Sequence, residues 1–345
     1  MAYTTIDNSQ EHFNTVLYTG NGGTNNITGV GHQPDWVWLK ERTGAAHDHF
    51  LFDVANGVKR FLSTNDTGTL ASADNDYLTS FNSDGFSLGS SDGMNQNSII
   101  FTSWNWKANG SGASNTDGTI NTTKTSANTT SKFSISTYSG TGSAATFGHG
   151  LGVAPDAVIV KNLAATEDWN VWIRATTPNI GLLNEDDAFY SPGAAGIVGA
   201  TITSDVIGLS TSATANSSGV AYVAYCFASV QGFSKFGSYV GNGNVDGAFI
   251  NTGFKPGWVL IKRSSAGGDQ WQLSDSKRGV NGAIKTLYPD SAEVESSSDS
   301  IHFLSNGFKN RATSVARNGA GSTYIYMAFA ESPFVSSSGV PTTAR

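Results

Sequence analysis

The sequence predicts an all-β protein of three tandem β-sandwich repeats, jelly-roll-like, each of about 100 residues. Each repeat opens with an aromatic strand that runs into a Gly-rich turn, at residues 17–22, 137–142 and 238–243. Next comes an apolar strand that begins with proline and ends with lysine, at residues 34–40, 155–161 and 256–262. An aromatic strand closes each repeat, at residues 101–107, 222–228 and 324–330. This repeat length is too long for a solenoid unit and suits a small sandwich domain.

The first and third copies agree in register. Asp53 and Gly57 recur 222 positions later as Asp275 and Gly279, and the same offset separates the prolines of the two copies. The second copy keeps the opening and closing strands but has Arg174 where the others have aspartate. Such agreement indicates one structural motif used three times.

The repeated motif predicts structural roles. The three prolines should lie at equivalent strand starts, and each lysine ends an apolar run where the chain returns to water. We therefore expect exposed or snorkelling amines on the lysines. The motif residues are Pro34, Lys40, Asp53, Gly57, Pro155, Lys161, Pro256, Lys262, Asp275 and Gly279.

The repeat spacing predicts the domain organisation. Repeat 1 should span residues 1–108, repeat 2 residues 132–230 and repeat 3 residues 231–335, followed by a tail over 336–345. The intervening segment 109–131 is rich in Gly, Ser, Thr and Asn with almost no apolar residue. That composition is typical of a flexible linker or a long exposed loop.

Composition bounds the classes of function. The chain has 345 residues, of which 14% are charged, and its formal net charge of −7 repels a phosphate backbone. We therefore expect no nucleic acid partner. Nor do we expect a signal peptide or a membrane span, because neither a basic leader nor a long apolar run is present. The single cysteine, Cys226, lies in an apolar strand and is interpreted as a buried structural thiol.

Metal and catalytic motifs are sparse. His47 and His49 alternate along a strand-like segment and could meet one ion, and Glu185 and Asp187 belong to an acidic loop that could hold Ca²⁺. Neither pair recurs in the other copies, so an exposed edge and a solvated turn are the favoured interpretations. No nucleophile with its base and no shared acidic pair is repeated. We expect no catalytic residues, no cofactor, no essential metal and no enzyme activity.

The eight tryptophans have two interpretations. Trp36 and Trp38 share one face of a strand whose other face is also apolar, which favours a sandwich core. An exposed aromatic platform for stacking sugar rings is the functional alternative.

The pattern Tyr-x-Gly-x-Gly, Pro-Asp/Gly-Trp-Val-x-x-Lys, Asp-x-x-x-Gly and Asp/Asn-Gly-Phe resembles an uncharacterised repeated β-domain of marine tailed-phage virion proteins. The first copy carries it at residues 18–22, 34–40, 53–57 and 84–86, and the third copy at 239–243, 253–262, 275–279 and 306–308. The second copy departs most, with Ala157 at the Trp position. The resemblance brings no catalytic or ligand residues.

This resemblance implies a non-enzymatic virion structural protein, located on the tail or capsid surface and assembled in the host cytoplasm. A tail-associated or fibre-like component that contributes to host adhesion is favoured. Capsid decoration is the alternative, and a lectin-like carbohydrate-binding module is the third. The expected partners are other virion proteins, further copies of the chain in a homo-oligomer, and a host-surface glycan, with no membrane insertion.

Overall fold

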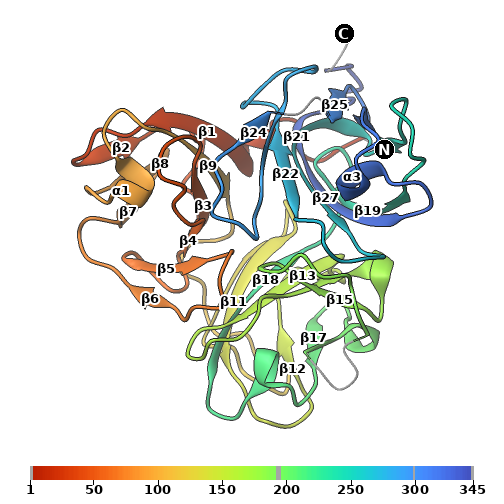
Figure 1. Cartoon of the computed structure of the whole chain (residues 1–345). Coiled ribbons are helices and arrows are strands. Elements are labelled where there is room, and N and C mark those ends of the chain that lie inside the picture. Colours follow the sequence, from red (N-terminus) through yellow and green to blue (C-terminus); the bar gives the residue numbers. More distant parts are fainter. Residues whose placement is uncertain (1–2, 192–195, 298–299, 343–345) are drawn as a thin grey trace.

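The chain folds into three sandwich-like lobes. The computed structural model describes residues 3–191, 196–297 and 300–342, with 41% of residues in strands and 6% in helices. Three six-stranded sheets, each paired with a three-stranded sheet, confirm the predicted all-β repeats. In Figure 1 the lobes surround a common centre. We call them module 1 (residues 8–107), module 2 (108–230) and module 3 (231–333).

Modules 1 and 3 contain equivalent strands in the same order, and module 2 differs from them at its two edge strands. Module 1 contains η1 (Ser9–Glu11), β1 (Phe13–Thr19), β2 (Asn25–Ile27), β3 (Trp36–Glu41), β4 (Phe50–Asp53), β5 (Arg60–Ser63), β6 (Ala71–Ser72), β7 (Leu78–Asn82), β8 (Gly85–Leu88), α1 (Asp92–Asn95) and β9 (Ile100–Trp106). Module 2 contains β10 (Lys124–Asn128), β11 (Phe133–Ser139), β12 (Ala145–Gly148), β13 (Ala157–Asn162), β14 (Asn170–Ile173), η2 (Arg174–Thr176), β15 (Ile180–Leu182), β16 (Ile197–Val198), η3 (Gly199–Thr201), β17 (Val206–Leu209), α2 (Ala213–Asn216) and β18 (Ala221–Phe227). Module 3 contains β19 (Ser234–Val240), β20 (Phe249–Asn251), β21 (Phe254–Arg263), β22 (Gln272–Asp275), β23 (Lys285–Leu287), β24 (Ser296–Ser297), β25 (Ile301–Leu304), β26 (Gly307–Asn310), α3 (Val315–Asn318) and β27 (Thr323–Pro333).

The large sheets share one strand order. It runs β1-β9-β3-β4-β5-β6 in module 1 and β19-β27-β21-β22-β23-β24 in module 3. Module 2 has β10-β11-β18-β13-β14-β15, so it gains β10 at one edge and lacks the last strand at the other. In every module the closing strand lies between the opening strand and the Pro-anchored strand.

The three prolines occupy equivalent positions, as the spacing predicts. In each module the residue two positions after the proline faces the same place on the closing strand. These pairs are Trp36 with Trp106, Ala157 with Phe227, and Trp258 with Phe329. The register corrects one assignment. Ile173 pairs with Ala157, as Asp53 pairs with Trp36 and Asp275 with Trp258. The counterpart of the two aspartates in module 2 is therefore Ile173, and not Arg174 as the sequence spacing indicates.

Residues 109–131 are not a flexible linker or a simple exposed loop. They include β10, which pairs with β11 along the edge of the module 2 sheet. Ile120, only 6% exposed, belongs to the apolar core of that module. The polar composition was misleading because an edge strand takes its stability from backbone pairing and needs few apolar side chains.

The three large sheets bury their inner faces in one shared core. Along β3, Trp36 and Trp38 belong to this central cluster, whereas Val37 and Leu39 belong to the outer cluster of module 1. Strands β13 and β21 alternate in the same way, so each Pro-anchored strand is buried on both faces. All eight tryptophans are at most 2% exposed, which confirms the core interpretation and excludes the exposed aromatic platform.

The modules close into a ring. Phe13 of module 1 stacks on Phe329 of module 3, with ring centroids 5.2 Å apart. The N-terminal segment continues the same contact, because the Tyr3 hydroxyl donates to the Gly253 carbonyl at 2.6 Å. Asp7 also accepts hydrogen bonds from Ser337. One chain therefore has the arrangement of a closed trimer.

Candidate functional site

The three motif lysines are buried, contrary to expectation. Lys40, Lys161 and Lys262 have no exposed surface. Lys40 and Lys161 donate across a junction between two modules, whereas Lys262 donates to the Asp269 carbonyl of its own module and is influenced by the charges of Asp186 and Asp187 in module 2. The Lys40 amine donates to the carbonyl of Ala292 in module 3 at 2.8 Å, and Lys161 donates to that of Thr67 in module 1 at 3.0 Å. Burial lowers the pKa of each of these two amines to about 8. Each lysine lies four residues after the first central-core position of its strand, so strand alternation directs it inward.

Backbone hydrogen bonds repeat the same contact at all three junctions. The carbonyl of the residue two positions after each lysine accepts a hydrogen bond from a backbone N–H of another module. Module 1 donates to module 2, module 2 to module 3, and module 3 to module 1. The pairs are Leu70 to Leu163 at 3.0 Å, Phe189 to Ser264 at 3.0 Å, and Glu295 to Arg42 at 3.2 Å. The modules are therefore related by a pseudo-threefold arrangement.

The motif aspartates also act across junctions. Asp53 accepts from the Tyr225 hydroxyl of module 2 at 2.8 Å, and Asp275 accepts from the Trp104 indole of module 1 at 2.9 Å. At the remaining junction the acceptor position holds Ile173. The position equivalent to Tyr225 and Trp104 there holds Met327. Acceptor and donor are thus replaced together by apolar side chains of the central core.

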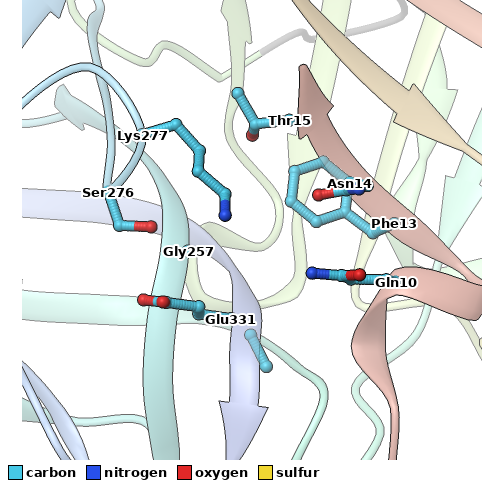
Figure 2. A pocket seen from close by; sticks show the side chains of 9 residues that line it. Gln10, Phe13, Asn14, Thr15, Gly257, Ser276, Lys277 and Glu331 are labelled. Atoms are coloured by element: carbon cyan, nitrogen blue, oxygen red, sulfur yellow. The ribbon is translucent and has the colours of Figure 1, made fainter. Parts of the chain in front are cut away.

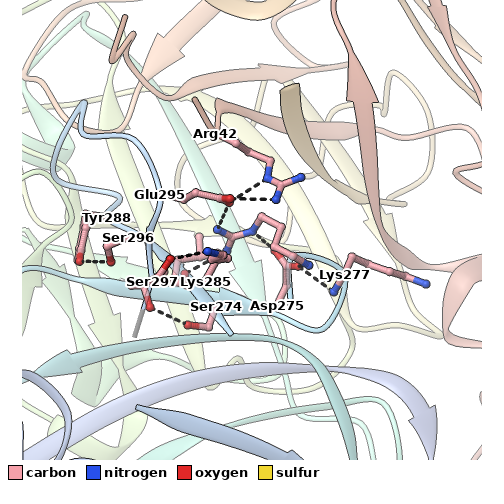
Figure 3. A network of polar contacts seen from close by, with 12 residues as sticks. Arg42, Ser274, Asp275, Lys277, Lys285, Tyr288, Glu295, Ser296 and Ser297 are labelled. Atoms are coloured by element: carbon pink, nitrogen blue, oxygen red, sulfur yellow. Dashed lines mark hydrogen bonds and ion pairs between the residues drawn. The ribbon is translucent and has the colours of Figure 1, made fainter. Parts of the chain in front are cut away.

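The junction of modules 3 and 1 carries an ion-pair network, drawn in Figure 3. Arg278 pairs with Asp275 at 2.6 Å and approaches Glu295 at 3.6 Å, and Glu295 also pairs with Arg42 at 2.8 Å. The Arg278 guanidinium lies over the Trp104 ring, 5.4 Å from its centroid. These charges cross-link two modules within a buried interface.

The two histidines proposed as metal ligands do not converge. His49 is fully buried and accepts the Trp38 indole N–H at Nδ1, at 2.9 Å. It occupies the place of the junction tryptophans Trp169 and Trp271, and burial lowers its pKa well below 6.5, with a smaller contribution from the Lys40 charge. His47 instead contacts Glu41. Both histidines therefore have structural contacts of their own.

The acidic loop is separate from the histidines. Glu185 and Asp187 are exposed, and Glu185 accepts from the Asn184 amide at 3.1 Å. Burial raises the pKa of Glu185, with further contributions from Asp168 and other acidic neighbours. Within the described residues, no group of three or more His, Cys, Asp or Glu side chains is placed to hold a metal ion.

Described residues of module 3 contribute to a smaller and a larger hollow. The smaller, shown in Figure 2, encloses about 280 Å³, open solvent included, between β1 and β21, with the exposed Lys277 at its rim. The larger encloses about 1160 Å³, open solvent included. Its lining is polar and comes from modules 2 and 3: Asp186, Gly268, Asp269, Gln270, Gln272, Tyr288, Glu293, Ser296, Ser300, Ala312, Ser314, Ala316 and Arg317. We call it the module 3 hollow.

Arg317 is the most unusual residue of the module 3 hollow. It is 2% exposed, and its guanidinium donates to three neutral oxygens, on Gln272 at 3.3 Å, Ser274 at 3.1 Å and Thr286 at 2.6 Å. Its Nη1 is buried without a hydrogen-bond partner. Burial lowers the pKa of Arg317 to about 10, so the side chain remains charged at neutral pH.

The equivalent positions of module 1 are apolar. Strand register identifies three of them, and the number of residues to the closing strand identifies the fourth. Three aromatic rings and a thioether occupy these positions in module 1. Gln272, Ser274, Thr286 and Arg317 correspond to Phe50, Phe52, Phe61 and Met94. In module 1 these rings pack together, with Phe50 and Phe61 centroids 5.3 Å apart. The same space thus holds a hydrophobic cluster in module 1 and a buried polar cluster in module 3.

Sequence reasoning missed Arg317 and a second repeated feature. Asn95, Asn216 and Asn318 are fully buried and fasten the short helices to the Gly-rich opening turns. The sequence pattern of this feature is Ser-x-x-x-Asn, at residues 91–95, 212–216 and 314–318. In each copy the asparagine lies nine residues before the residue of the closing strand that faces a junction, namely Trp104, Tyr225 or Met327. Aligning the copies on this motif places Arg317 beside Met94 and Ala215. That alignment would have shown the charge entering an apolar position.

Asp290, in the segment between β23 and β24, gives a pH-dependent prediction. Its side chain accepts a hydrogen bond from the backbone N–H of Trp271 at 3.2 Å. At the equivalent places the Asn65 side chain accepts from the backbone N–H of His49, and the Asn184 side chain accepts from that of Trp169. Oδ1 of Asp290 is buried without a partner, and burial raises the pKa of this carboxyl to about 7. Because the folded-state pKa is raised, the wild type should lose stability as pH rises from about 4 to about 7.

Asp290→Asn should therefore be more stable than the wild type at pH 8 and similar to it at pH 4. A rise from 3.8 to about 7 corresponds to about 4 kcal/mol, which we discount to about 2 kcal/mol because this half-buried group can draw water. Urea unfolding at the two pH values measures the difference. Equal stabilisation at both pH values would contradict a charge effect.

Comparison with known proteins yields one family match. The family described as "Domain of unknown function (DUF7483)" matches residues 8–333. No curated protein and no solved structure matches the chain. Within the described residues, no helix is long and apolar enough to cross a membrane.

Proposed function

We propose that this chain, which belongs to the DUF7483 family, is a non-enzymatic structural protein of a phage virion. Its most favoured place is a tail-associated or fibre-like surface position, where it contributes to host adhesion. Three modules closed around one core support this proposal. A rigid body with pseudo-threefold arrangement suits attachment to a symmetric assembly through broad surfaces.

The use of the repeated polar residues supports a structural role. Lys40, Lys161 and the backbone contacts common to the copies join the modules, and the buried asparagines fasten the turns. Residues repeated three times therefore serve construction, whereas the polar cluster around Arg317 occurs in module 3. Variation on a rigid scaffold is the arrangement expected of a recognition protein.

Capsid decoration is the second candidate. The closed, three-lobed body in Figure 1 has a pseudo-threefold arrangement, which suits a threefold position in a capsid lattice. A decoration protein at such a position would contact capsid proteins through one face and leave the opposite face in solvent.

Labelling of particles tests both placements. Gold-labelled antibody raised against the purified chain should mark virions produced by the virus that encodes it. Label at the tail supports the first proposal, and label over the head supports decoration. Purified virions that carry no label, although the antibody recognises the chain in the lysate, would contradict a virion role. Depolymerisation of host-surface polysaccharide by the purified chain would contradict the non-enzymatic part.

A further inference from the structure

We propose that the module 3 hollow binds a sugar residue that carries a carboxylate, and that Arg317 is the residue that receives this carboxylate. The inference rests on the proposed adhesion function and assigns it a ligand class. Three features of the molecule support it: the buried guanidinium of Arg317, the hollow that this residue helps to line, and the apolar equivalent in module 1.

The buried guanidinium lacks a negative partner. Its hydrogen-bond acceptors are an amide and two hydroxyls, which satisfy geometry without neutralising the charge. In the part of the chain that the structure describes, Arg317 forms no ion pair, and Nη1 has no acceptor. An unpaired buried charge is costly, and a carboxylate is the partner whose planar geometry matches a guanidinium.

The sister module shows that the fold does not need this charge. Phe50, Phe61 and Met94 fill the same space in module 1 with an apolar cluster. A hydrophobic set is thus sufficient to build the sandwich, and the polar set in module 3 adds cost without a structural requirement. A buried charge that the fold does not need is what a binding site predicts.

The rest of the lining favours a sugar over a simple inorganic anion. The exposed carboxylates of Asp186 and Glu293 lie on the lining, whereas Asp269 is already paired with Arg263 at 3.0 Å. Two negative charges near Arg317 oppose a sulfate or phosphate dianion more strongly than a carboxylate monoanion. The carboxylates of Asp186 and Glu293 are acceptors suited to the neutral hydroxyls of a sugar. Tyr288 and Ser296, joined at 2.6 Å, add hydroxyl groups to the lining. One carboxylate on a ring of hydroxyls, as in a uronic acid, matches this distribution.

Calorimetric titration of the whole chain tests the proposal. The probes are galacturonate, its methyl ester, galactose and inorganic sulfate, each with the same protein at pH 7. We expect galacturonate to bind, and the ester, galactose and sulfate to bind at least about tenfold more weakly. Equal binding of galacturonate and its ester would overturn the proposal, as would no detectable binding of galacturonate at tens of millimolar. Tighter binding of sulfate would overturn the sugar assignment.

Two variants connect binding to the site. Arg317→Met, which introduces the residue of module 1, should weaken galacturonate binding at least about tenfold, whereas the exposed Arg174→Met should leave it unchanged. If Arg317→Met fails to fold, Ala312→Trp fills the hollow without removing the guanidinium and should also abolish binding. Unchanged binding in a folded Arg317→Met or in Ala312→Trp would overturn the proposal. Particle labelling is independent of this result, so failure here and failure of the virion role are distinguishable.

Discussion

Trp36→Ala should lower the free energy of unfolding by about 3–5 kcal/mol and should weaken modules 1 and 2 together. The Trp36 ring lies 4.4 Å from that of Trp106 in its own module, and 4.7 Å from Tyr225 and 5.7 Å from Phe133 in module 2, measured between centroids. Removing it opens a cavity in the shared core, which neither module can repair alone. Urea unfolding measures the loss, and hydrogen exchange shows where it spreads.

Phe86→Ala is the matched control for this variant. Phe86 is equally buried, but it lies in the outer cluster of module 1. Its loss should accelerate exchange mainly in the small sheet β2-β8-β7, because local openings are confined to the contacts that hold them. Trp36→Ala should accelerate exchange in β11 and β18 as well. Unchanged exchange in those two strands would indicate that the modules fold independently.

Asp275→Asn should cost about 3 kcal/mol, because it leaves the Arg278 guanidinium buried with a weakened set of partners. Both side chains of this pair are fully buried and lie 2.6 Å apart. Glu295, 3.6 Å from Arg278, retains part of the compensation. Thermal and urea unfolding of the variant measure the loss, and loosening of the junction of modules 3 and 1 should appear as faster hydrogen exchange in β9 and β22.

Asp53→Asn provides the comparison. Asp53 occupies the same position in module 1 and contacts Asn56 and Tyr225, and it forms no ion pair with any described residue. Burial raises the pKa of Asp53. A neutral amide should therefore be tolerated better at position 53 than at position 275, where the side chain faces an arginine. We expect a loss below about 1 kcal/mol. Similar losses in the two variants would show that the ion pair is not the source of the effect.

Repetition made the modules predictable from the sequence. The Pro-to-Lys spacing located three equivalent strands, and the alternation around Trp36 and Trp38 indicated strands buried on both faces. The fate of Lys40 could not be inferred in the same way. A lysine at the end of an apolar run usually reaches water, and here water is excluded because a neighbouring module covers the strand end.

The relation between modules depended on information that one strand does not contain. A strand with two apolar faces can bury its second face within its own module or against a neighbouring module. The periodicity of apolar residues along the strand is the same in the two cases. Paired substitutions were the available sign: where Ile173 replaces the acceptor, Met327 replaces the donor on the facing module. Arg317 escaped notice because its burial follows from tertiary packing, and a single arginine near a turn normally lies in solvent.

Covalent linkage of the modules changes what a closed trimer can tolerate. Three identical chains in this ring would each carry every substitution, so a guanidinium at the Arg317 position would be buried three times. In one chain the penalty falls once, and the apolar clusters of the other two modules keep their full stability. The two sides of a junction can likewise change as a pair without altering the other junctions. A fused ring thereby gains the freedom to be asymmetric, and specialised recognition can arise in one third of the molecule while the remainder stays committed to holding it together.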